Sequence, residues 1–223
     1  YVDSVSDPLH SFKEERLFSK ELCSEIVLSA SEIADEGAVL VGWDRRPSNP
    51  ELAKSAIDSL CRTGRTIILL EETTTPALQY AMLDHDAKLG FMITASHNPS
   101  VDTGLKILFE NGRKPTVDEE SAIESGLFRE RGSGGTRSKI EVISNTSYIQ
   151  QIRDAIIDLG RRGLIPEQGF LVDGSGGWIS IWLAEIISNA GFPCREVSDR
   201  DVAINLNCGA GSLSEGDVFE WGE

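Results

Sequence analysis

The sequence lacks the features that mark membrane-spanning, secreted or zinc-binding chains. No apolar run approaches the roughly 20 residues that a membrane helix needs, and no basic, apolar secretory leader is found in it. Only four cysteines occur, and no two of them form a CxxC pair: Cys23, Cys61, Cys194 and Cys208. We therefore expect free thiols in a reducing cytoplasm rather than disulfides or a zinc site.

Positive charge is scarce as well. The 223 residues hold 21 Lys and Arg against 36 Asp and Glu, which gives a formal net charge of −15. That charge repels nucleic-acid phosphates and acidic lipid surfaces, so we expect neither nucleic acid nor a membrane as the main partner. An anionic small molecule can still bind where cations gather locally. The sequence leaves the oligomeric state open.

Short apolar segments alternate with helical patterns through the first half of the chain. Three segments predict buried strands: 38–43, 65–70 and 90–94. Three others have helical spacing: 11–36, 47–64 and 76–86. In the second of these helices Asn49 is the expected N-cap, Pro50 takes the first helical position and Gly64 ends it. This alternation predicts a parallel sheet covered by helices.

The second half predicts a further unit of the same kind. Residues 103–114 predict a strand that enters an Asn-Gly turn, with a helix near 116–127, and the polar residues 129–139 predict a linker or exposed hairpin. Four elements then form a strand–helix–strand unit and its leading helix: 146–160, 169–174, 178–191 and 192–197. We expect an α/β protein of layered α/β/α domains with mainly parallel mixed sheets. The two expected domains are residues 1–131 and 137–223, the second incomplete.

The stretch FMITASHNPS (91–100) leaves the third predicted strand and ends in polar side chains. Functional loops of parallel sheets follow the carboxyl ends of the strands, which places Ser96 on the same edge as residues 44–49 and 71–76. A hydrolytic serine is disfavoured, because neighbouring side chains such as His97 point to opposite faces of an extended segment. The G-x-S-x-G elbow of such enzymes is also absent.

A serine that carries a phosphoryl group is the second interpretation. It needs a divalent cation, hydrogen-bond donors and a nearby cationic side chain. Lys106 lies ten positions beyond Ser96, and Arg45 and Arg46 follow the first predicted strand, where they are placed to meet an anionic ligand. The alternative is that these basic loops are merely solvated.

Several motifs then resemble one known family. The stretch TASHNPSVDTGLK (94–106) resembles the phosphoserine signature of the α-D-phosphohexomutases, and VGWDRRPSNPELA (41–53) resembles their G-x-D-x-R-x-S element. Three shorter segments are similar to further stretches of that family: TTTPAL, FLVDGSGG and INLNCGAG. The order and spacing best match the phosphoglucosamine mutase and phosphomannomutase branches. The resemblance covers residues 38–210.

The resemblance implies an isomerase that moves a phosphoryl group between C1 and C6 of a hexose or hexosamine phosphate through a bisphosphate. Ser96 would carry the phosphoryl group, and a phosphate oxygen on it would coordinate Mg²⁺. His97 and Lys106 would assist proton movement beside the reacting hydroxyl. Three residues would support the loop or contact substrate and phosphate: Arg45, Asn98 and Thr94.

Two departures from the family pattern affect these expectations. Thr103 stands where the family has an Asn. The metal loop of the family, Asp-Gly-Asp-x-Asp-Arg, is missing, and VDGSGG (172–177) has one carboxylate where that loop has three. We interpret 172–177 as a structural turn between a strand and a helix.

The third and fourth domains of the family are also absent from the sequence. We therefore expect the amino-terminal part of a phosphohexomutase with little activity alone, whether a natural truncation, a fragment or one piece of a longer protein. The alternative is a non-catalytic relative that binds sugar phosphates or a protein partner. A nucleotide-binding domain is disfavoured because no G-x-G-x-x-G follows the first strand.

Overall fold

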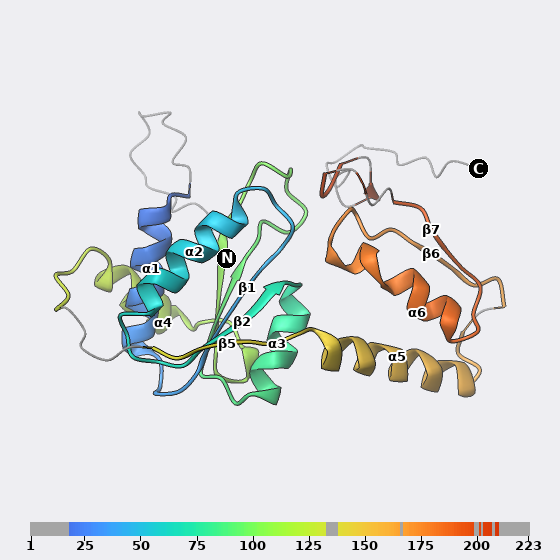
Figure 1. The fold of residues 1–223 in the computed structure, drawn as a ribbon, viewed down its shortest axis with the longest axis horizontal. Helices are drawn as coiled ribbons and strands as arrows, with labels where there is room; N and C mark the ends of the chain where they lie inside the picture. Colours follow the sequence, from blue (N-terminus) through green and yellow to red (C-terminus); the bar gives the residue numbers. More distant parts are fainter. Residues whose placement is uncertain are drawn as a thin grey trace.

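The computed structural model describes residues 18–132, 138–165, 167–198, 201, 203–206 and 208–209. These residues form one sheet of five strands and one sheet of two strands (Figure 1). Part of the helix expected at 11–36 lies outside the described residues. None of the helices in the described part is both long and apolar enough to cross a bilayer.

The five-stranded sheet is mixed and mainly parallel. Its spatial order is β4 (Leu105–Phe109), β3 (Leu89–Ile93), β1 (Val39–Trp43), β2 (Ile67–Glu72) and β5 (Ile140–Val142). β1 runs parallel to both β2 and β3, and β2 runs parallel to β5, while β4 is antiparallel to β3. The three predicted strands are therefore confirmed, and so is the class of the fold.

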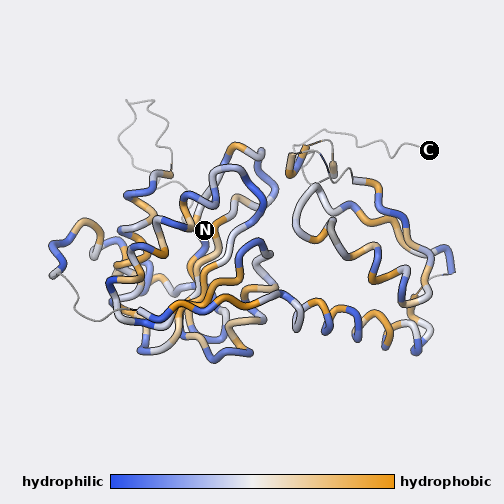
Figure 2. The backbone as a smooth tube through the Cα atoms, viewed as in Figure 1, coloured by the Kyte–Doolittle hydropathy of each residue, from blue (hydrophilic) through white to orange (hydrophobic). Residues whose placement is uncertain are grey.

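Helices cover both faces of this sheet. α1 (Lys20–Ile33), α2 (Asn49–Leu60) and α4 (Val117–Gly126) lie on one face, and α3 (Thr75–Asp84) lies on the other. Side chains alternate along β1, so that Val39 and Val41 pack against the first group while Leu40 packs against α3. The apolar strands run through the middle of these layers (Figure 2).

The second sheet pairs β6 (Phe170–Val172) in parallel with β7 (Cys194–Glu196). α5 (Thr146–Arg161) leads into it, and α6 (Leu183–Asn189) connects its strands. The single helix expected at 178–191 is wrong in its first part. Residues Trp178–Ile181 form a 3-10 turn, and the helix begins only after Trp182, whose φ of −140° is not helical.

β5 is a strand that the sequence did not indicate. It is three residues long, and both Ile140 and Val142 are exposed, so no buried alternation marks it. It pairs with β2 of the first sheet, although the expected boundary assigns it to the second domain. The two-domain division remains a prediction.

The expected cap of α2 is wrong. Ser48 occupies the N-cap, Asn49 is the first helical residue and Pro50 follows it. The Asn49 side chain is fully buried, and its amide donates to Asp44 Oδ1 at 2.6 Å and to the Ile93 carbonyl at 2.9 Å. The Asn49 side chain therefore bonds to these buried acceptors and does not cap the helix.

The expected linker at 129–139 is partly packed. Arg131 donates to Glu25 at 2.6 Å and to Glu32 at 2.7 Å, both on α1. Its side chain is only 12% exposed. Residues 133–137 lie outside the described residues.

The start of α4 is held by a capping box. The Thr116 hydroxyl accepts from the Glu119 backbone N–H at 3.3 Å, and the Glu119 carboxylate accepts from the Thr116 N–H at 2.7 Å. Arg113 donates to both oxygens of that carboxylate at 2.7 and 2.6 Å. The bonds from Arg113 are the main cause that lowers the pKa of Glu119 to about 2.

Replacing Glu119 by Gln should lower the free energy of unfolding near neutral pH by about 0.5–1 kcal/mol, because the partly exposed pair with Arg113 is lost. The folded pKa is depressed, so this contribution is present above the unfolded pKa of about 4.3 and disappears as the pH falls toward that of the folded carboxyl. Urea unfolding at neutral and at low pH checks this, with Glu120→Gln as the exposed control. A difference of equal size at both pH values would contradict it.

Candidate active site

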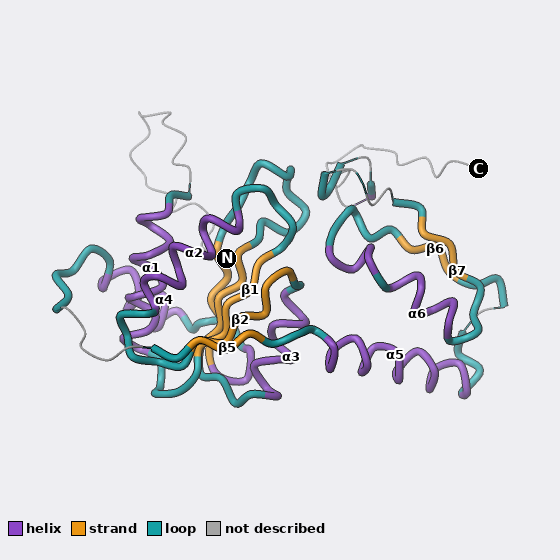
Figure 3. Tube along the Cα trace, viewed as in Figure 1, coloured by secondary structure: helices purple, strands orange, loops and turns teal. Residues whose placement is uncertain are grey.

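Three loops meet at the carboxyl ends of the parallel strands. They follow β1, β2 and β3 and begin at Asp44, Thr73 and Thr94. The Asp44 N–H donates to the Ile93 carbonyl at 3.1 Å, and the Thr73 N–H donates to the Trp43 carbonyl at 2.8 Å. The common edge expected from the sequence is therefore confirmed. Figure 3 draws these loops in teal beyond the strand ends.

Ser96 lies in the loop after β3, here called the Ser96 loop (residues 94–104). The residue is exposed to solvent, and its φ of +56° is in the left-handed region that a serine rarely adopts. Its N–H donates to Thr94 Oγ1 at 3.1 Å. A left-handed L-residue costs roughly 1–2 kcal/mol, so the surrounding contacts must hold this conformation.

Thr94 and Thr103 support the Ser96 loop from inside. Thr94 is buried, and its hydroxyl donates to Asp44 Oδ2 at 2.6 Å. The sequence predicted a phosphate contact for Thr94, but its hydroxyl proton is already used in this bond. The Thr103 hydroxyl donates to Asn49 Oδ1 at 2.6 Å. The residue that departs from the family pattern thus still links the loop to the start of α2.

Arg46 is the buried cation of the site. Its side chain is fully buried, and Nε donates to Asp44 Oδ2 at 3.1 Å. The other guanidinium hydrogens go to backbone carbonyls of the Ser96 loop: Ser96 at 2.7 Å, Asn98 at 3.1 Å, Asp102 at 3.0 Å and Pro99. All five guanidinium donors are occupied. The expectation that Arg46 meets an anionic ligand is therefore wrong.

Asp44 neutralises the Arg46 charge and organises the loop ends. Its Oδ1 accepts from Asn49 and from the Arg46 N–H, the latter at 3.3 Å, and its Oδ2 accepts from Thr94 and from Arg46 Nε. Four donors therefore surround one buried carboxylate. Sequence reasoning missed this network, although Asp44, Arg46 and Ser48 are the fixed positions of the G-x-D-x-R-x-S element.

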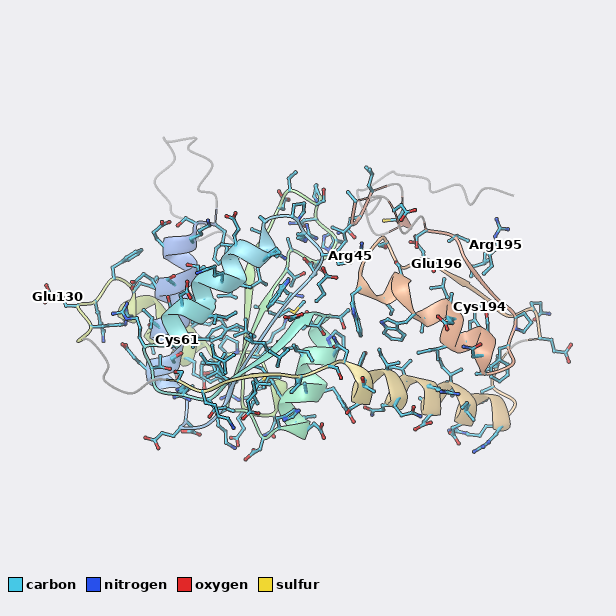
Figure 4. The ribbon with its side chains drawn as sticks, viewed as in Figure 1. Arg45, Cys61, Glu130, Cys194, Arg195 and Glu196 are labelled. Carbon is cyan, nitrogen blue, oxygen red and sulfur yellow. The ribbon has the colours of Figure 1, made fainter. Side chains whose placement is uncertain are left out.

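Arg45 remains at the surface. Its Nη1 donates to the Gly176 carbonyl at 3.2 Å, and its Nε lies 3.9 Å from Glu72 Oε2. Figure 4 labels Arg45 between the two sheets. Its charge therefore faces one carbonyl and one distant carboxylate, which leaves the exposed guanidinium with donors for a ligand phosphate.

Lys106 approaches the same edge from β4. It pairs with Met92 of β3, and its Nζ donates to Thr75 Oγ1 at 3.2 Å, at the start of α3. Burial, with the like charge of Lys114 second, lowers the pKa of Lys106, while Asp44 opposes the shift. A half-buried amine with a lowered pKa can exchange a proton with a bound hydroxyl.

His97 is exposed beside Ser96, and Asn98 is half-buried. The described residues show no hydrogen bond between the Ser96 and His97 side chains, as expected for neighbours in sequence. The Asn98 backbone is engaged: its N–H donates to the Ala95 carbonyl at 3.1 Å, and its own carbonyl accepts from Arg46.

The turn after β6 does not resemble a metal loop. Asp173 Oδ1 accepts from the Ser175 N–H at 2.9 Å, and Oδ2 accepts from the Gly209 N–H at 2.7 Å. These bonds support the interpretation of 172–177 as a structural turn. In the part of the chain that the structure describes, no three His, Cys, Asp or Glu side chains gather to hold a metal ion. Those residues therefore do not form a complete Mg²⁺ site.

Comparison with known proteins places this geometry in a family. Residues 11–133, more than half of the chain, match the family described as phosphoglucomutase/phosphomannomutase, alpha/beta/alpha domain I. A phosphoglucosamine mutase of Thermobifida fusca is 28% identical over 201 residues, which are 86% of this chain and 44% of that protein. One of Synechococcus sp. strain CC9311 is 30% identical over 80% of this chain and 40% of its own length.

Solved structures agree on the fold. A phosphoglucomutase/phosphomannomutase family protein of Burkholderia thailandensis superposes with a TM-score of 0.63 at 18% identity, over 85% of this chain and 42% of that one. The chain spans about two fifths of the length of the relatives it matches. On the match over residues 11–133 and the shared α/β/α layers, the chain belongs to the phosphoglucomutase/phosphomannomutase family, whose amino-terminal domain I it contains.

Proposed function

We propose that the chain contributes the phosphoserine part of a phosphohexomutase, with Ser96 as the phosphoryl carrier. The observation that carries the proposal is the presentation of Ser96: an exposed hydroxyl on a left-handed residue, held by a buried network at the edge where three parallel strands end. The names of the relatives favour a hexosamine phosphate as the substrate class. Phosphates of this class are small anions, which can bind to this acidic chain where cations such as Arg45 and Lys106 gather locally, and we expect a reducing cytoplasm as the setting.

The proposed chemistry exchanges one phosphoester for another. The bond between phosphorus and Ser96 Oγ breaks as a bond to a sugar hydroxyl oxygen forms; the sugar hydroxyl loses its proton to a base, and the departing Ser96 Oγ takes up a proton. The bisphosphate then turns, and its other phosphoryl group returns to Ser96 Oγ, which loses its proton, while the sugar oxygen that this group leaves regains one. Lys106 is the proposed base, Arg45, His97 and Asn98 are the proposed phosphate contacts, and Thr94 supports the Ser96 loop.

Magnesium is a proposed cofactor only of a larger assembly. A phosphate oxygen on Ser96 could supply one hard ligand, but the described residues do not supply the carboxylates that would complete the site. We therefore expect little mutase turnover from this chain alone.

The pH dependence of transfer tests the role of Lys106. Its folded pKa lies below the ordinary 10.5, and only the neutral amine accepts a proton. Above about pH 8, where phosphate monoesters are fully ionised, the rate of transfer from phosphorylated Ser96 to a hexose monophosphate should rise about tenfold per pH unit until Lys106 is neutral. Lys106→Met should flatten this slope, and the exposed control Lys54→Met should keep it. A slope that survives in Lys106→Met would exclude this residue as the base.

The function itself is tested by phosphate labelling. The purified chain is incubated with a hexose 1,6-bisphosphate and Mg²⁺, and the modified residue is located by mass spectrometry. Phosphate on Ser96 supports the enzyme. Sugar-phosphate binding without phosphate on Ser96 would favour the alternative, a non-catalytic relative that binds sugar phosphates. The observation that supports this alternative is that VDGSGG (172–177) has one carboxylate where the metal loop of the family has three.

A further inference from the structure

Four backbone carbonyls of the Ser96 loop turn toward one guanidinium. They belong to Ser96, Asn98, Pro99 and Asp102, and none of these residues lies in a helix or a strand. Carbonyls outside regular structure need other donors when water is excluded. Arg46 supplies these donors from a planar fork, whose position is set by Asp44 on the opposite side. The guanidinium therefore fixes the curvature of the loop.

A second donor comes from the segment that follows the second sheet. Asn205 Nδ2 donates to the Ser96 carbonyl at 2.6 Å and to the Asn98 carbonyl at 2.8 Å, across 109 and 107 positions of sequence. These are the two carbonyls that Arg46 Nη2 also reaches. A carbonyl oxygen has two lone pairs, so each oxygen takes one donor from each side.

Asn205 is itself anchored for this contact. Its φ is +62°, a conformation that Asn tolerates better than most residues. Its N–H donates at 2.8 Å to the carbonyl of Ser175, in the turn that follows β6. Asn205 therefore links the turn after β6, in the second sheet, to the backbone carbonyls of Ser96 and Asn98. Neither Arg46 nor Asn205 makes a hydrogen bond to the Ser96 hydroxyl in the described residues.

We infer that Arg46 and Asn205 form a two-sided carbonyl clamp that fixes the direction of Ser96 Oγ. Both are positioning residues, because they act through the backbone of Ser96. Arg46 holds the loop to the first sheet. Asn205 makes the geometry of the nucleophile depend on where the second sheet lies. The consequence for phosphoryl transfer rests on the proposed function, whereas the clamp itself does not.

Hydrogen exchange of the Ser96 loop is the first test. Asn205→Gly keeps the left-handed backbone and removes the amide, and Arg46→Ala removes the guanidinium. Asn205→Gly, which removes two hydrogen bonds to the loop, should raise amide exchange across residues 96–104 about tenfold, and Arg46→Ala, which removes four, should raise it further. Exchange in β1 and β3 should stay unchanged in Asn205→Gly. Asn189→Ala and Arg153→Ala, at exposed positions, are the matched controls.

Labelling of Ser96 is the second test. The rate of phosphate incorporation should fall about tenfold in Asn205→Gly and further in Arg46→Ala, and guanidinium ion below denaturing concentrations should restore part of the Arg46→Ala rate. Rescue by guanidinium but not by ethylammonium marks a planar donor rather than a general loss of structure. If Arg46→Ala does not fold, Asn205→Gly decides alone.

The outcomes separate the clamp from the function. Unchanged exchange at residues 96–104 in Asn205→Gly would overturn the clamp, whatever happens to labelling. Raised exchange in the variants, with no labelling even of the wild-type chain, would support the clamp and overturn the proposed function. Raised exchange with an undiminished labelling rate would overturn the positioning role.

Discussion

Ser96→Ala loses all phosphate incorporation from a hexose 1,6-bisphosphate. Within residues 94–104, Ser96 alone combines an exposed hydroxyl with a left-handed backbone, whereas the hydroxyls of Thr94 and Thr103 donate to buried oxygens. The substitution removes one exposed atom, and the backbone N–H at this position can still donate to Thr94, so the free energy of unfolding should change by less than about 1 kcal/mol. Quantitative mass spectrometry of the intact chain and its peptides measures the effect.

Ser100 provides the matched control for this prediction. It lies in the same loop and is half-buried, and its backbone φ is not in the left-handed region. Ser100→Ala should label at the wild-type rate. Phosphate that persists in Ser96→Ala, at Ser100 or elsewhere, would show that the loop is modified without selecting Ser96.

Asp44→Ala should be the most destabilising change near the site. It leaves the fully buried guanidinium of Arg46 without its carboxylate, the Thr94 hydroxyl without its acceptor, and the Asn49 amide with only one of its two acceptors. Removing one member of a buried ion pair costs about 3–5 kcal/mol of unfolding free energy. The reason is an uncompensated buried charge rather than the strength of the pair itself.

Urea unfolding followed by circular dichroism measures this loss. Glu71→Ala removes a carboxylate from an exposed position at the end of β2 and should change the free energy by less than about 0.5 kcal/mol. If Asp44→Ala lost no more than Glu71→Ala, the buried network would not hold the site as described.

The sequence predicted the fold well where burial makes a local pattern. β1, β2 and β3 are apolar runs between helical segments, and their parallel order follows from that alternation. β5 gave no pattern because its apolar side chains are exposed. The turn at Trp178–Ile181 was missed because it has the same apolar composition as the helix that follows it.

The positions of the site residues were predicted better than their contacts. Ser96 and Lys106 lie at the expected edge, but Arg45 and Arg46 are neighbours of one type, and composition cannot tell which of them turns inward. The backbone after β1 decides this: Arg46 points into the protein and Arg45 toward Gly176. Asn205 lies in INLNCGAG, a segment that resembles the family, but the sequence did not indicate its contact with the Ser96 loop, because its partners lie more than 100 positions away.

The central claim is that Ser96 passes a phosphoryl group to a sugar. The most direct measurement isolates the chain labelled at Ser96, adds an unlabelled hexosamine or hexose monophosphate with Mg²⁺, and follows both products in a single turnover. The account predicts that phosphate leaves Ser96 and appears as the sugar bisphosphate at the same rate. Phosphate that stays on Ser96, or that is released only as inorganic phosphate, would contradict it.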